Sequence, residues 1–277
     1  MDLNTTEYND IIKRIKIKRT IARILIFITA ALLILSFPIQ LKFNGEIIFD
    51  YKGFQSPALF FIIVAFVAEL IAHIIICLPI YNSLFEECNA QKNVIMLNAL
   101  ESEKRACHLF YTAYFYLGDF DTSIYYSNKA IESKTQSNKL AGLFNKARCE
   151  FFSDRIEDFK RTVSEFDSLF ANAKFSKRQT AIISKYQNVI NLLSAILNKD
   201  NEKIKEFTIK LQPWQDTKIV NSFINYLKGV ASYELGDKKE STYRFMAVCD
   251  VASKTVLGEL SEKYLSDINK EKDTQEN

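Results

Sequence analysis

Hydrophobic residues are crowded into the first third of the chain, where they form two long apolar runs. The first run, residues 24–41, has no charged side chain, and the second, residues 54–85, carries Glu69 as its only formal charge. A helix needs about 20 mainly apolar residues to cross the bilayer core. Neither run has the polar stripe of a helix that borders a soluble core. The pattern therefore predicts two transmembrane helices within residues 21–85.

Basic residues around these runs predict how the two helices are oriented. Six of them precede the first run, at Lys13, Arg14, Lys16, Lys18, Arg19 and Arg23. The loop between the runs has only Lys42 and Lys52. Positive residues resist translocation, so the basic segment 1–20 is expected in the cytosol. Two spans return the chain to the same side, which predicts a multi-pass protein of the cell membrane, in contact with lipid and with both termini cytoplasmic. A cleaved signal peptide is the alternative for the first run, but no small-x-small cleavage site follows it.

The segment between the runs predicts a short exterior loop near residues 42–56. It contains Asn44-Gly45 between partly alternating apolar residues. This dipeptide tolerates the positive φ angles of a type I′ turn, so we expect a small β-hairpin here.

Glu69 and His73 are polar side chains inside the second run, four residues apart on one face of the predicted helix. One hypothesis is a proton-sensitive site, or a contact with the transmembrane helix of a partner. The other is structural: Glu69, protonated or paired with His73, holds the two spans together. The sequence leaves both hypotheses open.

After Glu86 the pattern changes to amphipathic helices separated by short polar breaks, and helical pairs recur along the chain. The clearest pairs are residues 113–132 and 226–248, each with a Leu-Gly-Asp turn between its helices. Glycine suits the C-terminal end of the first helix, and aspartate can cap the second. Two weaker pairs, with turns near residues 154 and 199, lie between them at residues 138–170 and 178–211. A final amphipathic helix is predicted over residues 254–270, followed by a disordered tail at 271–277.

The first of these pairs resembles the tetratricopeptide repeat family, whose unit is a helix–turn–helix of about 34 residues. The segment GDFDTSIYYSNKAIE resembles the common family sequence GDYDEAIEYYQKALE. Ser123 stands where the family prefers alanine, and Tyr111 where it often has glycine. The last pair matches the family at Gly229, Gly236, Asp237 and Phe245, with Ser241 again replacing alanine. The resemblance covers residues 100–250. It implies an all-α domain over residues 86–270, a solenoid of about four helical hairpins with a C-terminal capping helix.

The family binds peptides or protein segments in a groove lined by the first helix of each pair. The resemblance implies that the groove is lined by Arg105, His108, Thr112, Phe144, Arg148, Phe151, Tyr226, Val230 and Tyr233. Each of these residues also has a structural interpretation, as part of the core or of the bare surface. The set lacks the lysine and asparagine clamp of chaperone-binding members, so their EEVD-type ligands are not expected.

Composition and motifs narrow the classes of function. The five cysteines are widely spaced, and only two histidines occur, so no metal ligands are predicted. We find no phosphate-binding, dinucleotide-binding, zinc-protease or serine-hydrolase motif, and so predict no enzyme, catalytic residue or cofactor. The net charge is +3, and its basic cluster adjoins the first apolar run, so nucleic acid is not an expected partner. Abundant Lys, Ile, Asn and Phe favour a bacterial source with an AT-rich genome.

These observations favour a membrane-anchored adaptor or scaffold whose cytosolic groove binds a protein or peptide. Two alternatives remain. One is a regulatory membrane protein that senses a peptide. The other is an accessory subunit of a membrane transporter that uses Glu69 and His73.

Overall fold

The computed structural model describes residues 78–99 and 107–276, the strand residues 39–43 and 46–51, and scattered positions between 9 and 29. The chain divides into two compact units, residues 2–81 and residues 82–277. In the first unit, β1 (Ile39–Phe43) pairs antiparallel with β2 (Glu46–Tyr51), with an irregularity in register after Leu41. The hairpin predicted around Asn44-Gly45 is therefore confirmed.

The predicted membrane localisation requires a correction. Among the residues that the structure describes, no helix is long and apolar enough to cross a bilayer. The multi-pass arrangement with two cytoplasmic termini is therefore wrong. A span needs an uninterrupted helix of about 20 residues as well as an apolar run, and hydropathy tests only the second requirement. Most of the two apolar runs, with Glu69 and His73, lies outside the described residues.

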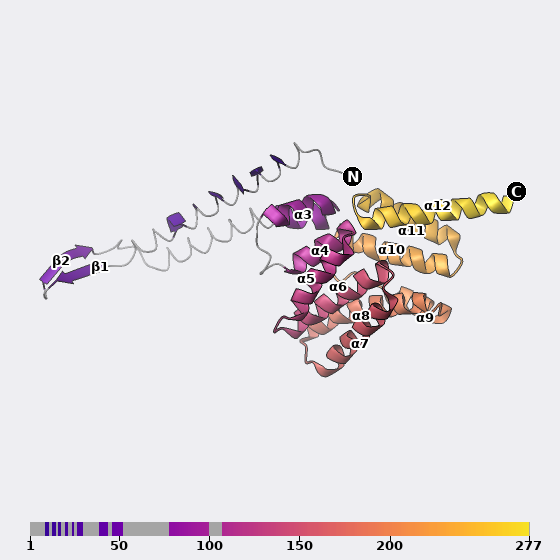
Figure 1. The fold of residues 1–277 in the computed structure, drawn as a ribbon, viewed down its shortest axis with the longest axis horizontal. Helices are drawn as coiled ribbons and strands as arrows, with labels where there is room; N and C mark the ends of the chain where they lie inside the picture. Colours follow the sequence, from indigo (N-terminus) through magenta and orange to yellow (C-terminus); the bar gives the residue numbers. More distant parts are fainter. Residues whose placement is uncertain are drawn as a thin grey trace. The chain divides into compact units, whose positions relative to one another are not determined.

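Helical pairs make up most of the second unit, and Figure 1 labels them along the chain. Apart from the hairpin, the elements that the structure describes are α-helices, so the predicted all-α class is confirmed. A helical stretch over 78–85 precedes α3 (Ala90–Ala99). The pairs that follow are α4 (Cys107–Leu117) with α5 (Phe120–Ile131), α6 (Gln136–Phe152) with α7 (Ile156–Asn172), α8 (Lys177–Leu197) with α9 (Asn201–Lys210), and α10 (Lys218–Glu234) with α11 (Lys238–Ala252).

The last element, α12, spans Val256–Glu276. It covers the predicted C-terminal helix except its first two residues, and it also covers most of the tail that was expected to be disordered from residue 271. Lysine, glutamate and glutamine in that tail have high helix propensity, which explains how the helix continues through a charged sequence.

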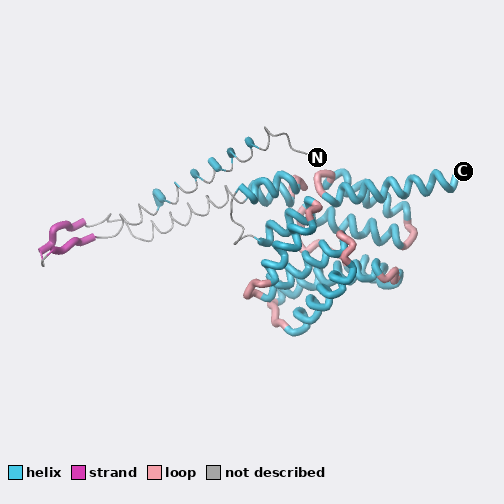
Figure 2. Tube along the Cα trace, viewed as in Figure 1, coloured by secondary structure: helices cyan, strands magenta, loops and turns pink. Residues whose placement is uncertain are grey.

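Short turns join the two helices of each pair, as Figure 2 shows by colour. Gly118 and Gly236 end the first helix of their pairs with φ angles of 86° and 81°, in the left-handed region that glycine enters without strain. The aspartate that follows each glycine caps the next helix, because its side chain accepts a hydrogen bond from a backbone N–H three residues later. The middle pairs make the same turn with Asp154 and Lys199 at φ 59° and 51°. The predicted turn positions are therefore confirmed.

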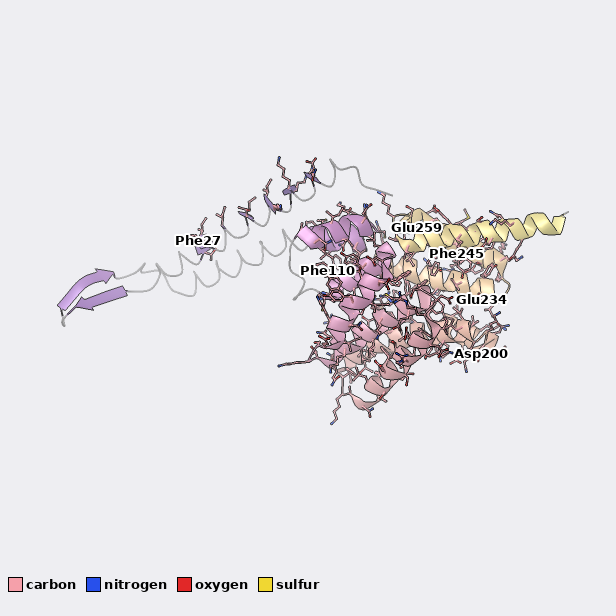
Figure 3. All side chains as sticks on the ribbon, in the orientation of Figure 1. Phe27, Phe110, Asp200, Glu234, Phe245 and Glu259 are labelled. Atoms are coloured by element: carbon pink, nitrogen blue, oxygen red, sulfur yellow. The ribbon has the colours of Figure 1, made fainter. Side chains whose placement is uncertain are left out.

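The first and last pairs also touch one another, which repeat periodicity does not predict. Helix α12 packs on α11 and reaches both α10 and α4. Phe223 of α10 lies against Phe115 of α4, with ring centroids 5.8 Å apart. Phe110 and Phe245, labelled in Figure 3 on α4 and α11, are completely buried. Aromatic rings therefore fill much of the space that an open array would leave between its ends.

Candidate functional site: a pocket around a buried arginine

Arg148 lies in α6 with only 3% of its surface exposed. Aromatic rings from α4, α6, α10 and the loop 211–217 surround its guanidinium group. The guanidinium carbon lies 4.2 Å from the ring centroid of Phe115 and 4.5 Å from that of Phe144. The rings of Phe223 and Trp214 follow at 5.0 and 5.7 Å. These distances are within the range of cation–π attraction, which partly offsets the loss of water around the charge.

A buried hydrogen-bond network fixes one side of this guanidinium. Arg148 Nη2 donates to Asn145 Oδ1 at 2.5 Å. The Asn145 amide nitrogen donates to Ser123 Oγ at 2.8 Å and to Ser127 Oγ at 2.9 Å. Ser123 Oγ in turn donates to the backbone carbonyl of Tyr111 at 2.7 Å. The network ties α6 to both helices of the first pair, so it holds Arg148 in a defined position.

The other side of the guanidinium has no such support. Nε and Nη1 of Arg148 are buried without a hydrogen bond of normal geometry; the buried hydroxyl of Tyr116 interacts with the guanidinium, but it carries no charge. Arg148 is also absent from the ion pairs formed within the described part of the chain. An arginine stays protonated at any pH at which proteins fold. The fold therefore contains a permanent positive charge with unused donors.

A cavity of about 160 Å³ lies beside Arg148. Its walls come from the end of the 78–85 helical stretch, from α4, α6, α8 and α10, and from the loop 211–217. The lining residues are Phe85, His108, Leu109, Tyr111, Thr112, Tyr116, Ala141, Phe144, Arg148, Tyr186, Trp214, Gln215 and Val220. His108 and Gln215 are exposed, so the cavity opens to solvent between them.

The aromatic wall of the pocket is built by three rings in mutual contact. Tyr186 stacks on Phe144 with ring centroids 4.2 Å apart and ring planes 9° apart. Trp214 meets both rings edge-on, at 5.3 Å from Phe144 and 5.6 Å from Tyr186. Edge-to-face and stacked contacts of this kind hold aromatic side chains in fixed orientations.

Burial also sets the protonation of the pocket. It raises the pKa of the Tyr116 phenol to about 12, although the positive charge of Arg148 and a hydrogen-bond interaction with its side chain act in the opposite direction. Burial raises the pKa of Tyr186 as well. Although His108 is exposed at the rim, its partial desolvation lowers the pKa of the imidazole and favours the neutral form. At neutral pH the pocket therefore presents phenol donors and a single cation.

Four of the side chains predicted to line a groove meet at this pocket: His108, Thr112, Phe144 and Arg148. The remaining ones do not. Phe151 packs on Phe159, and Tyr226 is buried against Phe245. Tyr233 donates to Glu271 at 3.1 Å. Val230 is buried, and Arg105 lies outside the described residues.

Sequence reasoning missed three aromatic residues of the pocket: Trp214, Tyr186 and Tyr116. Trp214 is the only tryptophan in the chain and lies in a loop that follows a weak repeat. A single tryptophan next to a proline, in a polar break, is the sequence feature that points to this residue, since tryptophan is enriched among the residues that contribute most binding energy. Tyr186 and Tyr116 had no comparable signal, because aromatic residues at helical spacing are common in any helical core.

Comparisons with known proteins add no assignment to this geometry. No family model matches the chain, and neither a curated protein nor a solved structure matches it.

Proposed function

We propose that this chain is a protein-interaction module that binds a peptide, or an extended segment of a protein, and catalyses no reaction. Its helical pairs would act as a tetratricopeptide-like array, with the Arg148 pocket as the main contact point. One observation carries the proposal: four side chains that the family resemblance assigns to the ligand-binding face line the same pocket.

The composition of the pocket supports this function. Arginine, tryptophan and tyrosine are the residues that contribute most binding energy in protein interfaces, particularly in well-packed, desolvated sites. Arg148, Trp214 and Tyr186 all line the cavity. At about 160 Å³ the cavity is smaller than the roughly 300–1,000 Å³ of typical small-molecule sites. It suits one side chain of a larger ligand better than a whole metabolite.

Selection from a random peptide library on the full-length chain tests the proposal. Ala141→Phe is the blocking variant, because Ala141 is half-buried in the pocket wall and a phenyl ring there would fill the cavity. Ala247→Phe is the matched control, since Ala247 is a half-buried alanine of α11 that does not line the pocket. We expect selected peptides to lose at least about tenfold in affinity for the blocking variant alone. Failure to select any peptide, or equal affinity for the two variants, would contradict the proposal.

A further inference from the structure

The unused donors of Arg148 indicate what kind of group the pocket accepts. Removing a charged group from water costs several kcal/mol unless hydrogen bonds and an opposite charge replace the water. Asn145 supplies one neutral acceptor, and the aromatic rings supply only the weak attraction of their faces. Nε and Nη1 make no hydrogen bond of normal geometry, and the Tyr116 hydroxyl that interacts with the guanidinium carries no charge. An acceptor with a negative charge is the group that this site lacks.

The geometry points to recognition of a carboxylate: Arg148 binds one carboxylate of the peptide, and the rings around it exclude water. This inference rests on the proposed function and names the chemistry of its ligand. A guanidinium group pairs with carboxylates along an edge made by two nitrogens, and each edge of Arg148 keeps one nitrogen without a partner. One carboxylate neutralises the single positive charge, whereas a doubly charged phosphate would leave a buried negative charge without a partner.

Entry of the carboxylate requires a ring to move, because Nε and Nη1 are covered in the free chain. Trp214 is the ring best placed to do so. It is half-buried, and it lies in the loop 211–217, whereas Phe115, Phe144 and Phe223 belong to helices. Binding would therefore change the surroundings of Trp214. Because this is the only tryptophan in the chain, its fluorescence reports on this pocket alone.

Tryptophan fluorescence of the full-length chain tests the inference with three defined peptides. The first is a blocked alanine pentapeptide with a central glutamate, and the second has glutamine in its place. The third is an N-acetylated alanine pentapeptide with a free C-terminal carboxylate. We expect a saturable change with at least one carboxylate peptide and at least about tenfold weaker binding of the glutamine peptide, because hydrogen bonds to charged groups are strong. The stronger of the two carboxylate peptides shows whether a side chain or a chain terminus is the natural source.

Three variants make the result specific. Arg148→Met keeps a long side chain but removes the charge, and it should abolish the preference for glutamate over glutamine. Ala141→Phe should block all three peptides, and it gives an independent test if Arg148→Met does not fold. Ala247→Phe should behave like the unchanged chain.

Two results would overturn the inference, and they have different consequences. Equal binding of the glutamate and glutamine peptides, blocked by Ala141→Phe, would remove carboxylate selectivity but leave peptide binding intact. No saturable change with either carboxylate peptide, up to about 10 mM, would also overturn it, since weaker binding is not specific. In that second case the peptide library decides separately whether the proposed function stands.

Discussion

The first and last helical pairs have the same turn but different interiors. Both join their helices through Leu-Gly-Asp, and in both the aspartate caps the second helix. In the last pair Gly229 makes room for Phe245, whose ring would lie 2.9 Å from a Cβ added at the glycine. The equivalent positions of the first pair, seven residues before the turn glycine and nine after it, are Tyr111 and Ser127. The bulky aromatic side chain therefore lies on the first helix in the first pair and on the second helix in the last pair.

The serine five residues after each turn glycine shows the consequence. Ser123 accepts a hydrogen bond from Asn145 and donates one to Tyr111, whereas the buried hydroxyl of Ser241 has no partner. With serines at 123 and 127, the first pair has the acceptors that Asn145 needs, and Asn145 then positions Arg148. The same helical hairpin thus has an apolar core in the last pair and supports a polar site in the first pair.

The largest expected effect on stability comes from a substitution in the last pair, whose interior is apolar. Phe245→Ala removes a fully buried ring that stacks on Tyr264 at 4.7 Å between centroids. We expect a loss of about 3–5 kcal/mol in the free energy of unfolding, measured by urea denaturation followed by circular dichroism. Met246→Ala is the control, because Met246 is exposed on the same helix, and it should change stability little. Equal losses in the two variants would show that the last pair is not organised around Phe245.

The hydrogen-bond network of the first pair should be disrupted most by a substitution at Asn145. Asn145→Ala removes the amide donor from two serine hydroxyls and leaves Arg148 Nη2 without its acceptor. We expect a loss of about 2–3 kcal/mol in the free energy of unfolding, because buried groups without partners are costly. Combining this change with Ser123→Ala should cost less than the sum of the two single losses. Strict additivity in that double-mutant cycle would argue against a connected network.

The two turn glycines should differ in a measurable way although both have positive φ. Alanine at either position costs about 1–2 kcal/mol from backbone strain. A Cβ at position 118 would also lie 3.2 Å from Val256 Cγ2, whereas a Cβ at position 236 meets nothing within 4 Å. We expect Gly118→Ala to lower the urea midpoint more than Gly236→Ala, and Val256→Ala to reduce the difference. Identical midpoints would mean that α12 does not press on the first turn.

The smallest expected effects on stability are those of replacing Ser123 and Ser241, and they should differ between the two positions. Ser123→Ala should cost about 1 kcal/mol, because it removes a hydroxyl that is hydrogen-bonded at both ends. Ser241→Ala should be neutral or slightly stabilising, since it removes a buried hydroxyl that makes no hydrogen bond. Thermal unfolding of the two variants side by side gives the comparison, and a larger loss at position 241 would contradict it.

The sequence predicts well the features that are set by residues close together in the chain, and it predicts poorly the contacts between distant residues. The helical pairs and turns follow from apolar spacing and from Gly118 and Gly236, which act within a few residues, and these predictions are confirmed. The contact of Phe223 with Phe115 joins residues more than a hundred positions apart, and no periodicity encodes it. For that reason the predicted groove residues divide between the pocket and the core.

Arg148 illustrates the same limit at the level of a single site. Its place on the first helix of a pair marks it as a candidate, but its burial and unused donors depend on Trp214 and Phe223, which come from later in the chain. The membrane prediction has a different status. It rested on the length of two apolar runs and on the basic residues beside them, and the described residues contain no helix that is long and apolar enough to cross a bilayer.

The position of Val256 has a consequence for how the whole array responds to a ligand. Because the start of α12 abuts the turn at Gly118, the two ends of the array brace each other. A change in the pitch of the array would have to break this contact between α12 and the first turn. The contact therefore favours an array whose helices are in place before a ligand arrives, so that apart from the movement of Trp214 binding carries little ordering cost.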